Sequence, residues 1–219
     1  MKVAAVTGLA AEAEVARRAG ITAEPSGGIA AQTTAIAENL LRDSADALIS
    51  FGLAGALAPG LAPGALLVPR AVIDESGARY TVDADWRMRV IDALRGAGLW
   101  LEERDVLGAG EVAASLTRKA EFHRITGAAA IDLESHLVAQ AALRAGRPFL
   151  VLRAVADSAT QALPDAAVHG LARNGKPALG RVLRSVARDP RQIPALVKLA
   201  ADTRRGLDAL ASALRAISF

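Results

Sequence analysis

Residues 50–57 read SFGLAGAL and overlap the apolar run 47–51, which has the composition of a buried β-strand. Gly52, Ala54 and Gly55 leave room for a ligand to approach exposed backbone N–H groups. We interpret this segment as a small-residue loop at the carboxyl end of a strand, where open α/β sheets bind ligands. Small residues would equally let a helix cross close to the strand, so the segment alone leaves both readings open.

Two further segments share this plan of a hydrophobic run followed by acidic residues. IDLES, residues 131–135, places Asp132 and Glu134 at the end of a predicted buried strand, where carboxylates without partners would cost free energy of folding. A carboxylate there can accept hydrogen bonds from ribose hydroxyls, or Asp132 can cap a helix whose first turn contains Glu134. RAVADSA, residues 153–159, ends a strand in Asp157, which either serves as an acid kept protonated by apolar surroundings or caps a helix.

The rest of the chain alternates strand and helix patterns punctuated by glycine and proline. We predict one α/β domain over residues 1–219, with a mixed, mainly parallel central sheet covered by helices. Strands are predicted at 2–7, 47–51, 65–72, 105–107, 129–132 and 149–155, and helices at 11–19, 29–42, 86–95, 117–125 and 135–145.

Residues 177–219 are predicted to form a basic, helical C-terminal extension. Apolar positions recur at steps of three and four from Leu196 to Ile217, which places one stripe along a helix. Residues 173–219 carry a net charge of +7, against −4 for residues 1–172. Such a helix can pack on its own domain, pair with a second subunit or contact an anionic membrane, and packing on protein is the default.

Composition excludes several classes of function. The chain has no cysteine, which excludes disulfides and thiolate metal sites. His123, His136 and His169 lack ligand spacing, so neither a metal nor another cofactor is expected. The basic tail has no interleaved aromatic residues, which argues against nucleic-acid binding. The chain start leads into a strand pattern and no long apolar run follows, so we expect a cytoplasmic protein, peripheral to the inner membrane if its tail binds lipid.

With GLAAEAE at 8–14, these segments resemble the nucleoside phosphorylase and nucleosidase superfamily, which includes 5'-methylthioadenosine/S-adenosylhomocysteine nucleosidase. The resemblance runs in order over residues 1 to about 160. PSGGIAAQTTAIAENLLRDSADALISFGLAGAL is similar to the family's glycine-led helix, strand and loop, and LAPGALLVP to its next strand. IDLES resembles its ribose-binding segment and RAVADSA the segment with the purine-protonating Asp. The tail PRQIPALVKLAADTRRGLDAL is similar to that of the hopanoid-associated phosphorylases, the nearest subgroup.

This resemblance implies cleavage of the N-glycosidic bond of a purine nucleoside, with inversion, by phosphate or water. Asp157 would protonate purine N7 and Glu134 would hold the ribose hydroxyls. Glu12, with Glu14 as the alternative, falls where nucleosidases place the carboxylate that activates water. The other expected substrate-binding residues are Asp132, Leu133, Leu53, Ala54, Gly55, Gly8 and Val112.

The sequence departs from the phosphorylase pattern at the phosphate side. Classical bacterial phosphorylases bring arginines to phosphate from the N-terminal loop and from just before the small-residue loop, and neither neighbourhood contains one here. A carboxylate repels a phosphate dianion by roughly 1 to 4 kcal/mol at ~4 Å, which favours water. Inorganic phosphate as a co-substrate would depend on Gly8 and other backbone N–H groups near a helix start.

The resemblance to hopanoid-associated enzymes implies adenosylhopane as substrate, giving adenine and ribosyl- or phosphoribosylhopane. A 5'-methylthioadenosine/S-adenosylhomocysteine-type nucleosidase is the alternative. The resemblance also implies a homo-oligomer, dimer or larger.

Two readings from other classes compete. LGAGEVA, residues 107–113, fits the G-x-G-x-x-A fingerprint of NAD(P)-binding Rossmann enzymes, with Asp132 about 20 residues further on. Residues 101–105 before it are heavily charged, which suits an edge strand rather than that fold's buried first strand. A non-enzymatic nucleoside-binding module is opposed only by the coincidence of several carboxylates at strand ends.

Overall fold

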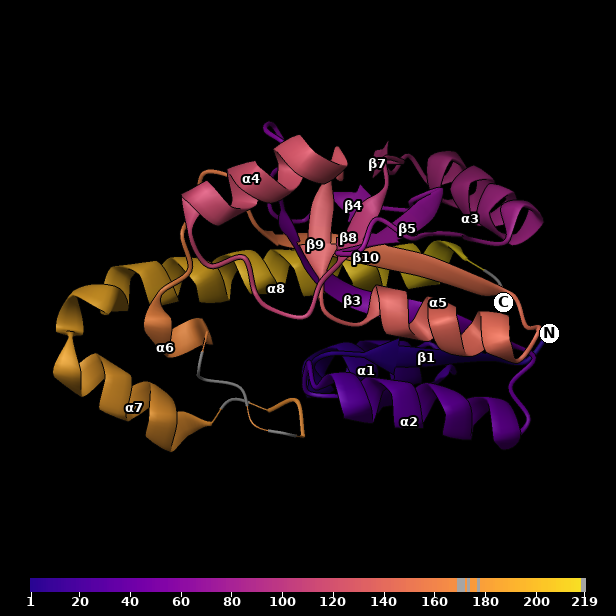
Figure 1. The fold of residues 1–219 in the computed structure, drawn as a ribbon, viewed down its shortest axis with the longest axis horizontal. Helices are drawn as coiled ribbons and strands as arrows, with labels where there is room; N and C mark the ends of the chain where they lie inside the picture. Colours follow the sequence, from indigo (N-terminus) through magenta and orange to yellow (C-terminus); the bar gives the residue numbers. More distant parts are fainter. Residues whose placement is uncertain (169–171, 173, 177, 218–219) are drawn as a thin grey trace.

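The computed structural model describes residues 1–168, 172, 174–176 and 178–217 (Figure 1). His169, Pro177 and the last two residues of the predicted extension lie outside them. One mixed, mostly parallel sheet runs through the described residues, which confirms the predicted α/β class. Its strands are β1 (Val3–Thr7), β2 (Thr22–Pro25), β3 (Ala47–Ala56), β4 (Leu66–Leu67), β5 (Ala71–Asp74), β6 (Arg79–Thr81), β7 (Leu101–Glu102), β8 (Val106–Gly108), β9 (Ala130–Asp132) and β10 (Phe149–Asp157).

The strand order is β6-β5-β8-β9-β3-β10-β4-β7, with β1 between β2 and the first half of β3. β3 is central because it pairs in parallel with β10 along most of its length. On its other edge, β3 pairs with β1 up to Ser50 and with the antiparallel β9 only from Gly55. Residues 51–54 therefore have no strand partner on that edge among the described residues. This change of partner opens the sheet between the ends of β1 and β9.

Helices cover the sheet from both sides, so the central strands are hydrophobic along nearly their whole length. Successive side chains of a strand point to opposite faces. Ser50 of β3 meets α5, where Ser50 Oγ lies 3.0 Å from Ser135 Oγ. Leu53, on the other face, meets α8. The helices are α1 (Ala10–Arg18), α2 (Ala30–Arg42), α3 (Ala84–Gly96), α4 (Leu116–Thr126), α5 (Ser135–Arg144), α6 (Asp165–Val168), α7 (Leu179–Arg188), the 3₁₀ turn η1 (Pro190–Gln192) and α8 (Ile193–Ala216).

The long helix α8 packs on the sheet through its C-terminal half, where Leu210, Ala213 and Leu214 are buried. It comes close to the strands at Gly206, where an added Cβ would lie 2.5 Å from Leu53 Cδ2. Together with α6 and α7, the N-terminal half of α8 forms an arm beside the body of the molecule (Figure 1). Packing on protein, the default expectation for this stripe, is therefore correct for its second half.

Most predicted elements are present with ends shifted by one or two residues, and four regions differ. Residues 52–55, expected as a loop, belong to β3, because β10 continues to pair with them beyond the end of β1. The single strand expected at 65–72 is two short strands, β4 and β5, which lie on opposite sides of β3 in the sheet order. Strand β6 and helix α6 were not predicted. The charged segment at 101–105 does contain an edge strand, β7.

Candidate active site

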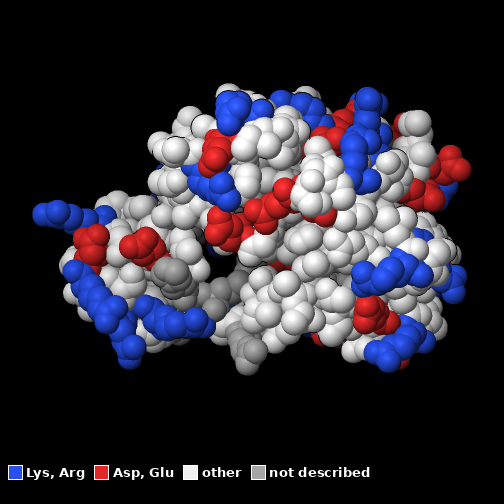
Figure 2. Space-filling model, viewed as in Figure 1, with Lys and Arg blue, Asp and Glu red and all other residues white. Residues whose placement is uncertain are grey.

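A cavity of about 240 Å³ lies where β3 changes partners. Figure 2 shows this face hollowed beside the arm, with acidic side chains gathered near the hollow. The cavity walls come from the ends of β1, β3, β9 and β10 and from α6 and α8. All ten residues that the sequence nominated line it, namely Gly8, Glu12, Leu53, Ala54, Gly55, Val112, Asp132, Leu133, Glu134 and Asp157.

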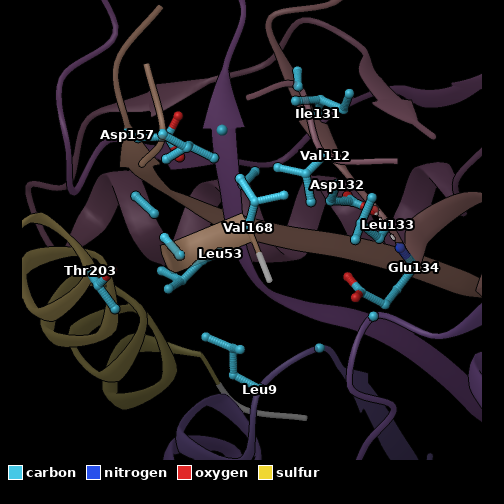
Figure 3. A pocket seen from close by; sticks show the side chains of 18 of the residues that line it. Leu9, Leu53, Val112, Ile131, Asp132, Leu133, Glu134, Asp157, Val168 and Thr203 are labelled. Carbon is cyan, nitrogen blue, oxygen red and sulfur yellow. Dashed lines mark hydrogen bonds between the residues drawn. The ribbon is translucent and has the colours of Figure 1, made fainter. Parts of the chain in front are cut away.

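The two acids named for base and ribose lie at opposite ends of this cavity. Figure 3 shows Asp157 at one end and Glu134 at the other, with Val168 between them. Both residues are 5% exposed. A ligand with one polar group for each end and an apolar middle would match this arrangement.

Glu12 is held at the gap in the sheet by backbone donors. It stands in the first turn of α1, where its Oε2 accepts hydrogen bonds from the N–H groups of Gly8 (2.9 Å) and Leu9 (2.7 Å). Its Oε1 accepts from the N–H of Leu53 at 2.8 Å, in the part of β3 without a ladder partner on that edge. Burial raises the pKa of Glu12, while Arg153 and these three N–H groups act in the opposite direction. The alternative acid, Glu14, is exposed and pairs with Arg18.

Glycines allow the acids to converge. A Cβ on Gly8 would lie 2.7 Å from Glu134 Oε1, and one on Gly52 would lie 2.6 Å from Glu12 Cδ. Gly52 also has a φ of +152°, which side-chain-bearing residues rarely adopt. The small residues of SFGLAGAL therefore provide space for neighbouring carboxylates, as well as for a ligand.

A fully buried arginine connects the acids beneath the cavity floor. Arg153 of β10 forms ion pairs with Asp132 (Nε to Oδ2, 3.1 Å) and Glu134 (Nη2 to Oε2, 3.0 Å), and Nη2 also donates to Ser50 Oγ at 2.7 Å. Because buried charges are tolerated only when paired, Arg153 and the acids depend on one another. Burial raises the pKa of Glu134 to about 7, despite the opposing effect of Arg153.

Asp132 lines the cavity and also binds the backbone at the start of α5. Its Oδ1 accepts from the N–H groups of Glu134 (2.9 Å) and Ser135 (2.7 Å) at the start of α5. Its Oδ2 accepts from Ser135 Oγ at 2.6 Å and faces Arg153. Asp132 thus binds backbone N–H groups at the start of α5, as the capping alternative expected, but Glu134 occupies the N-cap position instead of the first turn. Glu134 is the acid of the pair with an oxygen left for a ligand.

Asp157 ends β10 and caps no helix in the described structure. Its partner is Lys119 of α4, which forms an ion pair with Asp157 Oδ2. Burial raises the pKa of Asp157, and Lys119 acts against that rise. The carboxylate rests against Gly55, where a Cβ would lie 3.3 Å from Oδ2.

Mostly apolar side chains form the rest of the wall, with Glu111 and Thr203 as the polar exceptions. Figure 3 shows Leu9 and Thr203 across the cavity from Val112 and Ile131. The lining residues that the sequence did not nominate are Leu9, Gly28, Glu111, Ala113, Ile131, Ala156, Leu163, Ala167, Val168, Leu199 and Thr203. Leu199 and Thr203 belong to the predicted C-terminal stripe. The sequence pattern did not indicate which half of that stripe reaches the site. Lys119 was also missed, because a lysine in an otherwise charged helix reads as a surface residue.

The LGAGEVA segment does not form a dinucleotide fingerprint. After β8 the chain passes through a loop, and α4 begins at Leu116 with Ser115 as its cap, so no helix starts at the glycines. Gly108 instead gives space to His136, since a Cβ there would lie 2.5 Å from His136 Nδ1. The described residues contain no group of three or more His, Asp or Glu placed to hold a metal ion.

The comparisons with known proteins identify the family of the chain. Residues 6–188 match the sequence model of the Phosphorylase superfamily. The chain belongs to this superfamily, and it is an enzyme of the nucleoside phosphorylase and nucleosidase type, which cleaves N-glycosidic bonds. No curated protein matches the chain.

Solved structures share the fold at low sequence identity. The 5'-methylthioadenosine/S-adenosylhomocysteine nucleosidase of Helicobacter pylori, solved with butyl-thio-DADMe-Immucillin-A, is 15% identical with a TM-score of 0.70, and the similarity covers 99% of both chains. The Neisseria meningitidis nucleosidase, solved with methylthio-immucillin-A, is 18% identical with a TM-score of 0.70 over 99% of this chain and 100% of that one. Futalosine hydrolase of Helicobacter pylori is 14% identical with a TM-score of 0.70, over 99% and 98%.

Proposed function

We propose that this enzyme releases adenine from an adenine nucleoside that carries an apolar 5' substituent, with water as the nucleophile. The observation that carries the proposal is the convergence of Glu12, Glu134 and Asp157, all buried, on one cavity with apolar walls. Burying three acids costs free energy of folding. A functional site that uses the acids explains why they are buried together.

Each acid has one role in the proposed reaction. Asp157 gives its proton to purine N7 as the bond between C1' and N9 breaks, and the bond electrons leave with adenine. Glu134 accepts hydrogen bonds from the ribose 2'- and 3'-hydroxyls through Oε1, since Arg153 already occupies Oε2. Glu12 takes a proton from the water that adds to C1' on the opposite face, so the configuration inverts.

The charges around the cavity favour water over phosphate. None of the described residues that line it is Lys or Arg. The N–H groups of Gly8 and Leu9, which could have held a phosphate, already donate to Glu12. A dianion beside Glu12 would meet a repulsion of roughly 1 to 4 kcal/mol at ~4 Å.

The specific substrate proposed is adenosylhopane, converted to ribosylhopane and adenine. Its support is the likeness of the tail to hopanoid-associated phosphorylases, together with the apolar residues Leu9, Val168 and Leu199 on the cavity wall. The alternative, a 5'-methylthioadenosine/S-adenosylhomocysteine nucleosidase, is favoured by the structural similarity to nucleosidases.

Product analysis tests these statements together. Purified enzyme is incubated with adenosylhopane, 5'-methylthioadenosine or adenosine, in phosphate and in phosphate-free buffer, and products are identified by mass spectrometry. We expect adenine and a free ribosyl product at equal rates in both buffers, with adenosylhopane preferred. A 1-phosphoribosyl product formed only with phosphate would refute the choice of water, and preference for 5'-methylthioadenosine would favour the alternative substrate.

We also propose that the arm contacts an anionic membrane surface. Leu183, Ile193 and Val197 are exposed there, and α7 presents Arg181 and Arg184 to solvent. Figure 2 shows basic side chains on this arm. No helix in the described part of the chain has the length and apolar composition to cross a membrane. Co-sedimentation with phosphatidylglycerol vesicles should fall when Leu183 and Val197 are replaced by Ser, and unchanged binding would refute the proposal.

A homo-oligomer is the proposed state of the enzyme, by resemblance to the family. Light scattering coupled to size exclusion should give a mass of at least twice 22.5 kDa. A monomer at micromolar concentration would contradict it.

A further inference from the structure

One buried cation lies beside the cavity without lining it. Lys119 is 1% exposed on α4, and its Nζ forms an ion pair with Asp157 Oδ2. Nζ also donates to the carbonyl oxygens of Ser158 (2.8 Å) and Gln161 (2.9 Å). These three contacts use all three hydrogens of the ammonium group. Lysine is rarely buried so completely, so this position calls for an explanation beyond packing.

The contacts of Lys119 fix both the acid and the turn that follows it. The pairing of β10 with β3 shifts register between Val155 and Asp157, so the acid sits at an irregular strand end. Lys119 holds Oδ2 at that point, while Oδ1 accepts no hydrogen bond from the described residues. Gly55 supports the carboxylate from below. One oxygen is thus fixed and the other is left for a ligand in the cavity.

We propose that Lys119 is a positioning residue that orients Asp157 and stabilises the negative charge that develops on it as its proton passes to the purine. This inference rests on the proposed function. In the step, the Oδ1–H bond of Asp157 breaks, the N7–H bond forms, and Lys119 stays protonated beside the new carboxylate. Preorganised charges of this kind lower a barrier because they need no rearrangement during the reaction. Burial raises the pKa of Asp157 and Lys119 opposes that rise, in keeping with this role.

The test compares Lys119→Met with wild type in the pH dependence of adenine release. Without the ammonium, Asp157 should keep its proton to higher pH and be a weaker, less well oriented acid. We expect the plateau of the pH–rate profile to fall roughly 10- to 100-fold. The alkaline limb of the same profile should move up by about one pH unit or more. Arg124→Met removes an exposed positive charge from the same helix and should change neither. Lys119→Arg, which keeps the charge, should leave the limb near its wild-type position.

Carbon-13 NMR titration of the Asp157 carboxyl provides a readout independent of activity. If the carboxyl titrates at higher pH in Lys119→Met than in wild type, the inference is supported, whether or not a nucleoside is cleaved. If none of the nucleosides is cleaved, the proposed function fails, but this inference does not. An unchanged titration and an unchanged limb, with only a lower melting temperature, would mean that Lys119 is structural and would overturn the inference. Should Lys119→Met fail to fold, the same comparison is made with Lys119→Gln.

Discussion

The fit of α8 against the sheet connects the fold to the cavity, and Gly206→Ala tests that connection. The added Cβ would lie 2.5 Å from Leu53 Cδ2 and 3.2 Å from the carbonyl oxygen of Val155. Carbon atoms in contact are normally ~3.5 to 4.0 Å apart, so the shortfall is at least about 1 Å. Either Leu53 turns toward the cavity or α8 moves away from the strands.

The cost in stability should be small because two effects oppose each other. Overpacking costs roughly 1 to 3 kcal/mol, and alanine is better than glycine in a helix interior by about 1 kcal/mol. We expect a net loss of about 0 to 2 kcal/mol. The effect on the site should be larger, because Leu53 lines the cavity of about 240 Å³ and would turn into the space that the ligand needs. A displacement near 1 Å should lower kcat/KM by roughly 10- to 100-fold, mainly through KM.

Steady-state kinetics of adenine release and thermal unfolding measure the two effects separately. Gly180→Ala is the matched control, since it lies in α7 and an added Cβ there meets nothing within 4 Å. That variant should keep wild-type kinetics and equal or higher stability. Wild-type KM and kcat in Gly206→Ala would refute the claim that α8 sets the shape of the cavity.

Three further predictions concern the buried charges. Glu12→Gln turns an amide NH2 toward a backbone N–H, so the free energy of unfolding should fall by about 1 to 3 kcal/mol. Turnover should fall by ~10²-fold or more. Glu14→Gln, at an exposed position, should change neither melting temperature nor adenine release. Arg153→Met leaves Glu134 without its cation and should destabilise the fold by about 3 to 5 kcal/mol in urea unfolding; a loss below about 1 kcal/mol would contradict the network. Because burial raises the pKa of Glu134 to about 7, above its ordinary 4.5, its protonated form favours the folded state. Its contribution is therefore complete below pH 4.5 and is lost as the pH rises through 7, by at most about 3 kcal/mol, so Glu134→Gln should flatten the fall in stability between pH 5 and pH 8.

The class of fold and the residues that line the cavity were accessible from sequence for a physical reason. Acids such as Glu134 and Asp157 are costly at the ends of buried strands, so their presence in IDLES and RAVADSA is informative. Parallel strand ends meet at one edge of a sheet, which brings such segments together whatever their separation in the chain. The sequence therefore predicted that these residues share a cavity, and the structure has them lining one.

Other features depend on long-range pairing that a local pattern does not contain. Whether 52–55 is loop or strand depends on β10, which continues to pair with it one hundred residues away in sequence. The partners of Arg153 and the burial of Lys119 are set by how helices dock. Leu199 reaches the site because α8 approaches the strands closely at Gly206. A glycine within a helical stripe does not by itself predict such a contact.

Adenine release by Asp157→Asn, compared with wild type on an adenosyl nucleoside, tests the central claim most directly. The amide keeps the shape of the side chain and removes the proton that the purine needs. A loss of ~10²- to 10⁴-fold in turnover, in a variant that circular dichroism shows to be folded at the assay temperature, is the predicted result. Release of adenine at the wild-type rate would contradict the account.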